Sequence, residues 1–222
     1  AIELKSIPAI NTLGLLYLNG IYPVKKDINK AINCFKEAAK YNYAYAYNNL
    51  GKIHETKKEY KKALEYYEQS ANLGESWALN KLGEFYRLGT HVKKNMKKAF
   101  DYYNKAIDSP IDNICFHAYY NLAKYFYLTG NVVLKEDMKI ALKYLNIASE
   151  HKHIKSTILL LYLYSKKYTV TKDEHILNKI KELVKTIELH PEYNEEIKKD
   201  IEYNLKQIKK DNKINLDIIL KN

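Results

Sequence analysis

The chain has 222 residues, 46% of them hydrophobic, and a formal net charge of +11. This length and apolar content can supply a substantial core, and only seven glycines and four prolines leave little room for the turns of a sheet protein, so we expect an all-α fold. The sequence contains no phosphate loop, nucleotide fingerprint or nucleophile elbow, no visible signal peptide, and no apolar run long enough to span a membrane. These features favour neither an enzyme nor a membrane protein.

The positive charge raises the question of nucleic-acid binding. The lysines are dispersed along the chain, and Arg87 is the only arginine. Base readout and bidentate phosphate contacts favour arginine. We therefore expect solvated basic faces, with lysine-driven nucleic-acid binding as the less favoured alternative.

Residues 1–7 are expected to form a tail or the end of a preceding helix, and an internal repeat follows them. Its first column is a leucine followed by a small residue: Leu13-Gly14, Leu50-Gly51, Leu82-Gly83 and Leu122-Ala123. The columns of its second half are Ala31, Ala63, Ala99 and Ala141, then Phe35, Tyr67, Tyr103 and Leu145, then Ala38, Ser70, Ala106 and Ala148. These columns predict four stacked helical hairpins over residues 1–150, an α-α superhelix in which each glycine lets the second helix approach closely.

The third copy shows the predicted hairpin most clearly. Residues 77–88 and 96–107 carry apolar residues at helical spacing. Gly89 is expected to end the first helix as a left-handed cap. The first, third and fourth copies have a link that contains a glycine, a valine able to pack under it, lysines and an expected N-cap, which is Asp27, Asn95 or Asp137.

Residues 151–222 are predicted to form a degenerate repeat, a capping helix and a tail, continuous with the same solenoid. Residues 154–167 and 174–189 predict a further hairpin, and residues 193–210 predict an amphipathic helix that covers the open end of the stack. The apolar stripe of this last helix is Ile197, Ile201, Leu205 and Ile208. The tail at 211–222 either packs back on the last hairpin or docks on another chain.

The repeat resembles the Sel-one-like class of tetratricopeptide-like repeats over roughly residues 8–150. The likeness is carried by N-N-L-G…K-K-A-L-E-Y-Y-E-Q-S-A and by L-G-x-x-Y-x-x-G followed by V-K-K-D/N-x-x-K-A. The second copy is more similar to an ordinary tetratricopeptide unit, and Ala123 replaces the usual glycine in the fourth. The resemblance implies an adaptor role, as most families with this fold have. It also suggests the sensor half of a peptide-responsive bacterial regulator, in which a DNA-binding part would be expected upstream.

The histidines and cysteines do not form an evident metal or catalytic site. His151 and His153 stand two residues apart and share no helical face, so we expect them to be structural or solvated, and His54 to lie at the edge of the core. Cys34 and Cys115 belong to different copies, and a disulfide needs Cα atoms within about 7 Å. We therefore expect two free thiols in a reducing cytoplasm, with no metal, no cofactor and no enzymatic activity.

The remaining candidate site is the concave face that first helices form in stacked hairpins. The residues expected to face a ligand there are Asn11, Tyr45, Asn48, Lys52, Glu55, Trp77, Asn80, Glu84, Arg87, His117, Tyr120, Asn121, Lys124 and Tyr127. The asparagines of the first three copies share one column, two residues before each leucine, and amides can donate to and accept from an extended backbone. The aromatic residues would supply apolar pockets. The alternative is that these amides are solvated residues of a polar face.

The sequence therefore favours a non-enzymatic, cytoplasmic repeat domain that binds a peptide or protein segment in its concave groove, as the sensor or adaptor part of a larger bacterial regulatory protein. The alternative is a structural scaffold that self-associates through its C-terminal helix and tail.

Overall fold

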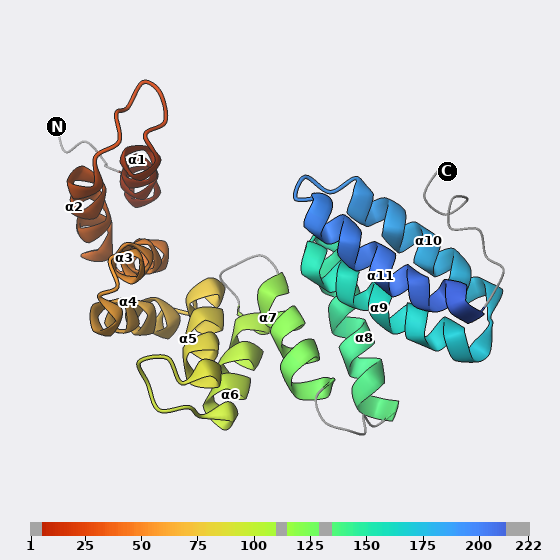
Figure 1. The fold of residues 1–222 in the computed structure, drawn as a ribbon. Helices are drawn as coiled ribbons and strands as arrows, with labels where there is room; N and C mark the ends of the chain where they lie inside the picture. Colours follow the sequence, from red (N-terminus) through yellow and green to blue (C-terminus); the bar gives the residue numbers. More distant parts are fainter. Residues whose placement is uncertain (1–5, 110–114, 129–134, 212–222) are drawn as a thin grey trace. The chain divides into compact units, whose positions relative to one another are not determined.

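A computed structural model describes residues 6–109, 115–128 and 135–211 (Figure 1). The helices are α1 (Ile7–Asn19), α2 (Ile28–Ala39), α3 (Ala44–Thr56), α4 (Tyr60–Asn72), α5 (Ser76–Leu88), α6 (Met96–Ile107), α7 (Phe116–Leu122) with its π-helical continuation η1 (Ala123–Tyr127), α8 (Lys135–Glu150), α9 (Ile154–Thr171), α10 (Glu174–Glu188) and α11 (Glu195–Asp211). The described residues contain no strand, which confirms the expected all-α fold. No helix in these ranges is both long and apolar enough to cross a membrane.

Contacts group the chain into two compact units, with the boundary between Ala118 and Tyr119 inside α7. The first unit contains the α1–α2, α3–α4 and α5–α6 hairpins, and the second contains the end of α7, η1 and α8 to α11. The predicted division at residue 150 follows the sequence repeat and stays a prediction.

A glycine and an aromatic ring hold each hairpin of the first unit together. A Cβ added at Gly14 would lie 2.5 Å from Phe35, one at Gly51 would lie 2.5 Å from Tyr67, and one at Gly83 would lie 2.6 Å from Tyr103. Real Cβ atoms do not approach other heavy atoms so closely. The predicted close approach is therefore confirmed, with a ring of the second helix seated directly on the glycine.

The repeat columns form the core. The second-helix alanines and the large residues four positions later are all fully buried: Ala31, Ala63, Ala99 and Ala141, then Phe35, Tyr67, Tyr103 and Leu145. In the first unit, α2 shares one apolar cluster with α3, and α4 shares another with α5. Helices α2 and α4 thus pack on their own hairpins and on the next one.

The links of the first and third hairpins have the same construction. Gly20 and Gly89 end their helices with φ angles of 70° and 74°, in the left-handed region that glycine adopts without strain. Asp27 accepts a hydrogen bond from Lys30 N at 3.0 Å, and Asn95 accepts one from Lys98 N at 2.9 Å, so both predicted N-caps are confirmed.

The expected N-cap at Asp137 is wrong. Helix α8 begins at Lys135, so Asp137 lies within its first turn, where a carboxylate still interacts favourably with the helix dipole. Val92 is half-buried and packs on the cluster that α4 and α5 share, as expected of a valine under the link. The equivalent link of the fourth copy lies outside the described residues.

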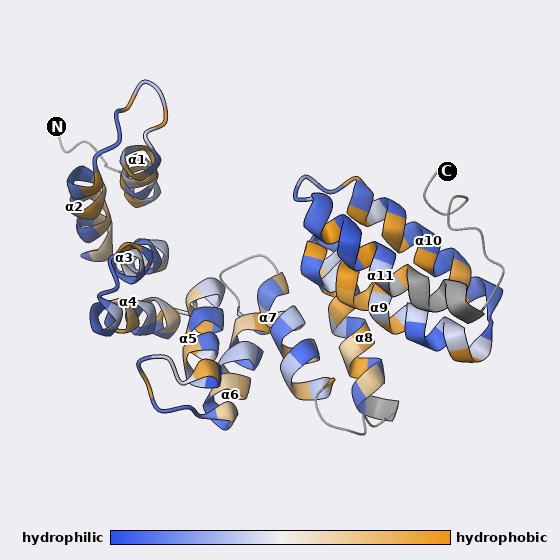
Figure 2. Cartoon of the chain, in the orientation of Figure 1, coloured by the Kyte–Doolittle hydropathy of each residue, from blue (hydrophilic) through white to orange (hydrophobic). Residues whose placement is uncertain are grey.

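The second unit has one apolar cluster that joins α8, α9, α10 and α11. Figure 2 shows hydrophobic and hydrophilic residues alternating around α10, as expected for an amphipathic helix. Helix α11 packs on α9 through Ile201 and Leu205, which are buried, and Ile197 borders the same cluster. The side chain of Ile208 and the tail at 212–222, with its two predicted arrangements, lie outside the described residues.

Candidate functional site

The first helices of the first unit form one layer. Asn49 Nδ2 of α3 donates to Asn11 Oδ1 of α1 at 3.0 Å, and Lys81 of α5 forms an ion pair with Glu55 of α3 at 3.5 Å. These contacts place α3 between α1 and α5. The exposed side of this layer is the face on which the sequence predicts a ligand.

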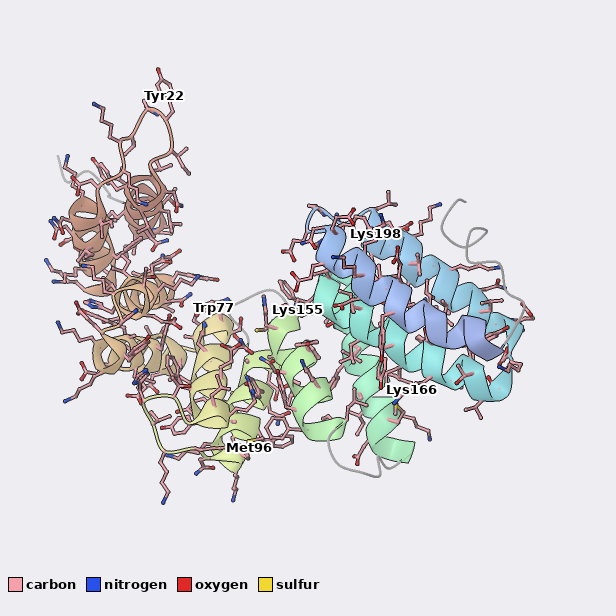
Figure 3. The ribbon with its side chains drawn as sticks, in the orientation of Figure 1. Tyr22, Trp77, Met96, Lys155, Lys166 and Lys198 are labelled. Carbon is pink, nitrogen blue, oxygen red and sulfur yellow. The ribbon has the colours of Figure 1, made fainter. Side chains whose placement is uncertain are left out.

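Trp77 lies near the start of α5 (Figure 3). Lys52 Nζ lies 4.1 Å from the centroid of its ring, and Lys81 Nζ lies 5.2 Å from the same centroid. Lys81 also pairs with Glu84 at 3.3 Å. We call Lys52, Glu55, Trp77, Lys81 and Glu84 the Trp77 cluster; Lys81 is the member that the sequence prediction missed.

Helical spacing brings the cluster together. Lys52 and Glu55 lie on one face of α3, while Trp77, Lys81 and Glu84 follow each other at four- and three-residue steps on α5. The repeat pattern already predicts that Glu55 and Glu84, the two carboxylates that pair with Lys81, lie on this face. The spacing of Lys81 from Trp77 was the signal that could have identified it.

Glu75 fixes the start of α5 and thus the position of Trp77. Its carboxylate is buried and accepts hydrogen bonds from Trp77 N at 3.2 Å and from Ala78 N at 2.7 Å. A carboxylate at a helix N-terminus is stabilised by the free N–H groups and the helix dipole. The indole therefore sits on a rigid helix end rather than on a loop.

Two tyrosines of the second helices, Tyr67 and Tyr103, form hydrogen bonds with residues of the first helices. Tyr67 Oη donates a 2.5 Å hydrogen bond to Glu55, and burial, then this bond, hold the pKa of Tyr67 far above its ordinary value. Tyr103 Oη accepts a 3.3 Å hydrogen bond from Arg87 Nε. Glu55 and Arg87 occupy the same repeat position, four residues after the glycine.

Lys52 is a half-buried cation of this face. Burial lowers its pKa, while the nearby carboxylates of Glu75 and Glu55 oppose that shift. A half-buried ammonium beside an indole can donate a hydrogen bond to an anionic or carbonyl oxygen of a ligand.

The predicted asparagine column lies deeper than a solvated face. Asn11, Asn48 and Asn80 are only 7%, 5% and 2% exposed. Asn48 Oδ1 is buried and has no hydrogen-bond partner among the described residues. Tyr45 is half-buried, with its ring 5.4 Å from that of Tyr43. The side-chain oxygen of Asn48 therefore remains able to accept a hydrogen bond from another molecule.

The remaining predicted residues lie on α7 and η1. In the first unit, the His117 ring lies 4.6 Å from Phe116. In the second unit, Lys124 Nζ donates to Tyr120 Oη at 3.1 Å, and Tyr127 packs edge-on against Tyr144 at 5.8 Å. Asn121 is buried. These contacts belong to separate units and do not extend the Trp77 cluster.

The histidines and cysteines have structural surroundings. His153 is buried, its Nδ1 lies 2.8 Å from Ser156 Oγ, and its ring packs against Tyr120 at 5.1 Å. In the described part of the chain, no three histidine, cysteine or acidic residues are grouped to hold a metal ion. Cys34 and Cys115 are free thiols, as predicted, and burial raises the pKa of Cys34.

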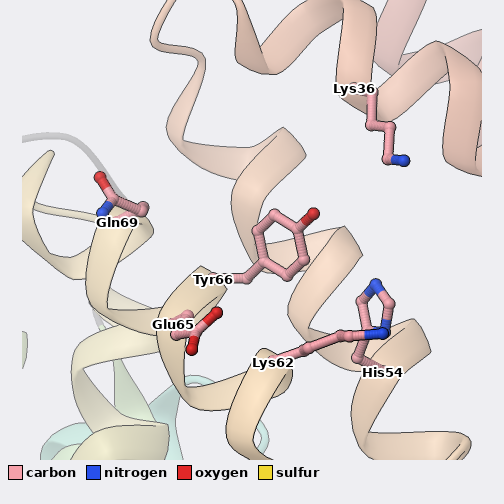
Figure 4. A pocket seen from close by; sticks show the side chains of 6 residues that line it. All are labelled: Lys36, His54, Lys62, Glu65, Tyr66 and Gln69. Carbon is pink, nitrogen blue, oxygen red and sulfur yellow. The ribbon is translucent and has the colours of Figure 1, made fainter. Parts of the chain in front are cut away.

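The sequence did not reveal a pocket of about 640 Å³ on the second-helix side of α2, α3 and α4. Figure 4 shows its six lining residues, Lys36, His54, Lys62, Glu65, Tyr66 and Gln69. The rings of His54 and Tyr66 stack at 5.2 Å, and His54 Nδ1 lies 2.9 Å from Glu59 Oε2. His54 thus lies at the edge of the core, as predicted.

Comparison with protein families matches most of the repeat region. The Sel1 repeat matches residues 7–43, 78–110 and 116–153. The tetratricopeptide repeat matches residues 44–77, which fill the gap between the first two Sel1 matches. The four predicted copies are therefore confirmed, including the tetratricopeptide-like character of the second. No curated protein matches the chain.

Solved structures with the same fold include a Sel1 repeat protein from Oxalobacter formigenes, 27% identical, with a TM-score of 0.66 over 81% of this chain and 72% of that one. A protective antigen of uropathogenic Escherichia coli with an SLR fold is 19% identical, with a TM-score of 0.69 over 91% of this chain and 41% of that one. An immunity protein from Pseudomonas aeruginosa is 18% identical, with a TM-score of 0.54 over 82% of this chain and 67% of that one. The last two show the fold alone.

Proposed function

Because the chain is a Sel1-like and tetratricopeptide-like helical repeat protein, we propose that it binds a segment of another protein on the first-helix face around the Trp77 cluster. Repeat folds of this kind typically serve protein–protein interaction and are generally non-catalytic scaffolds. The proposal includes a non-enzymatic adaptor or sensor role in the cytoplasm, which the two free thiols support.

The observation that carries the proposal is the Asn48 carbonyl oxygen. A buried acceptor without a partner costs about 1–3 kcal/mol, and such a cost is tolerated where a ligand satisfies the group. Asn48 stands one helical turn before Lys52, on the same side of α3. Because Asn48 Oδ1 is buried in the free protein, a bound segment reaches it only if the side chains that cover it move aside. A backbone N–H of the segment could then donate to Asn48 Oδ1 while an oxygen of the segment accepts from Lys52.

Trp77 supplies the apolar part of the same site. Its ring is half-buried and is already contacted by two lysine side chains. A bound segment that places an apolar or aromatic side chain against the indole would bury more of it and exclude water from the Asn48 and Lys52 contacts. An extended segment offers such side chains and the backbone groups together.

The chain allows a direct test, because Trp77 is its only tryptophan and its fluorescence reports on this face alone. A phage-displayed random peptide library is selected on the wild-type protein, and the selected peptides are titrated while Trp77 fluorescence is recorded. We expect saturable binding that Asn48→Ala and Lys52→Ala each weaken about tenfold, the effect of losing about 1.4 kcal/mol.

The matched control is Asn72→Ala with Lys97→Ala, which removes an exposed amide from α4 and an exposed lysine from α6. This variant should bind the selected peptides as the wild type does. Peptides whose affinity is the same for the wild type, Asn48→Ala and Lys52→Ala would contradict the assignment to this face.

A further inference from the structure

The first hairpin has an apolar groove between α1 and α2. It has a volume of about 420 Å³ and is lined mainly by Ala9, Ile10 and Leu13 of α1 and by Cys34 and Glu37 of α2. We call it the α1–α2 groove. It is separate from the Trp77 cluster, which lies on α3 and α5.

The repeat shows which positions of the later hairpins correspond to the residues that line this groove. Ala9 and Leu13 of α1 occupy the positions of Ala46 and Leu50 in α3 and of Ala78 and Leu82 in α5. Both alanines of the later helices are fully buried, and both leucines are 1% exposed. Leu13 is 40% exposed, and Ala9 is exposed as well.

The structure also shows what covers the equivalent positions. Ala46 and Leu50 lie in one apolar cluster with Ala31 and Phe35 of α2. The next copy repeats the arrangement, since Ala78 and Leu82 share a cluster with Ala63 and Tyr67 of α4. In both cases the cover is a helix with an alanine, an aromatic residue four positions later and a small residue after three more.

We propose that the α1–α2 groove binds an amphipathic helix of a partner protein that carries this alanine–aromatic–small stripe. A second copy of the chain is a poorer occupant, because the matching stripes of α2, α4 and α6 are already fully used within the chain. Ala31, Phe35, Ala63, Tyr67, Ala99 and Tyr103 are all 0% exposed.

The rim of the groove adds a preference for charge. Lys36 follows the aromatic residue of α2 and lines the pocket that contains Glu65 and Gln69 of α4. Glu37 occupies the position of Gln69 in the first hairpin, at the edge of the groove. A lysine directly after the aromatic residue of the partner helix would therefore approach the Glu37 carboxylate.

The probe for this proposal is a peptide with the sequence of residues 59–73, which contains the α4 stripe but no cysteine. The readout is the rate at which a thiol reagent modifies Cys34 in the full chain. Cys34 lines the groove and is half-exposed, whereas Cys115 is buried. Short isolated helices are marginally stable, so the peptide is used at about 1 mM.

We expect this peptide to slow the modification of Cys34 by about twofold or more. A peptide with Glu68→Lys, which places a lysine after the aromatic residue, should protect Cys34 at lower concentration. A control peptide with Ala63→Lys and Tyr67→Ser should give no protection. An unprotected Cys34, or equal protection by the control peptide, would overturn the proposal.

Leu13→Lys in the full chain changes the groove instead of the peptide. Leu13 is already 40% exposed, so the helical circular dichroism of the variant should equal that of the wild type. Protection by the peptide should disappear. Protection that persists in Leu13→Lys would place the peptide elsewhere and reject the groove.

Light scattering on the chain alone decides between a partner and a second copy. A monomer mass supports the partner helix, whereas a dimer mass that Leu13→Lys reduces to that of a monomer would overturn that assignment. The result is independent of the proposed function, because Asn48→Ala should leave the protection of Cys34 unchanged.

Discussion

Tyr67 of α4 reaches across its hairpin and donates a 2.5 Å hydrogen bond to the Glu55 carboxylate of α3. The same carboxylate pairs with Lys81 of α5, so one glutamate joins three helices of two consecutive hairpins. This relationship connects the buried column of the core with the face on which we propose binding.

Tyr67→Phe removes the hydroxyl and keeps the ring that covers Gly51. Hydrogen bonds to charged groups contribute about 1.5–3 kcal/mol when buried, and Glu55 is partly exposed, so we expect a loss of about 1 kcal/mol in the free energy of unfolding. Urea denaturation measures it. Tyr103→Phe is the matched control, because its 3.3 Å contact with Arg87 is longer, and it should cost less. An equal loss in both variants would contradict a special role for Glu55.

Gly51→Ala should destabilise the protein although alanine favours helices. The new methyl group would lie 2.5 Å from the Tyr67 ring, and such overpacking costs about 1–3 kcal/mol. The fourth copy has a different pair of residues at these two positions. Ala123 replaces the glycine, Leu145 replaces the aromatic residue, and both are fully buried.

The double variant Gly51→Ala/Tyr67→Leu copies that pair of residues. We expect its free energy of unfolding to fall by clearly less than the sum of the two single changes, because the smaller leucine leaves room for the methyl group. Strictly additive losses in urea denaturation would show that the two positions do not compensate each other.

Asn48→Leu separates stability from binding. It replaces a buried acceptor that has no partner among the described residues by an apolar group of similar size, so we expect unfolding to become harder by about 1 kcal/mol. Binding of the selected peptides should be lost. Asn80→Leu is the matched control, since Asn80 has an interaction partner and should be destabilised by the same change. Loss of stability in Asn48→Leu would show that the amide is satisfied in the folded protein.

Glu59 should contribute to the pH dependence of stability. Hydrogen bonds from His54 and then Lys62 lower the pKa of its carboxyl below the ordinary value of 4.5. A lowered pKa in the folded state means that this stabilisation is present above about pH 4.5 and is lost as the pH falls through the folded-state pKa.

Urea midpoints of the wild type and Glu59→Gln, measured from pH 7 down to pH 3, test this. We expect the wild type to be more stable near neutral pH and the two midpoints to converge in acid. Glu68→Gln changes an exposed glutamate of α4, the helix that Glu59 precedes, and its midpoints should stay parallel to those of the wild type. A constant difference between the wild type and Glu59→Gln across the range would refute the contribution.

The sequence alone was sufficient for the repeat and for its internal geometry. Glycine at residues 14, 51 and 83, with an aromatic residue in register on the second helix, has one economical explanation, which is contact between the two. Caps such as Asp27 and Asn95 are equally local, because a side chain and the backbone three residues later determine them.

Contacts between repeats could not be obtained in this way. The pairing of Lys81 with Glu55, the position of Lys52 on Trp77 and the burial of Asn48 depend on how α3 and α5 are placed side by side. A helical pattern gives the face on which a residue lies but not the depth at which a neighbouring helix covers it. The start of α8 at Lys135, which places Asp137 inside the helix and not at its N-cap, could not be obtained from the sequence pattern either.

What the sequence determined by itself is the helical hairpin, since the periodic spacing of small and aromatic residues acts within one repeat. The tertiary structure decided which polar groups of the repeat are buried and which apolar ones remain uncovered. The physical reason is that burial is a property of the stack: Leu50 and Leu82 are covered by the helix of the preceding repeat, whereas Leu13, with the same local sequence pattern, is 40% exposed.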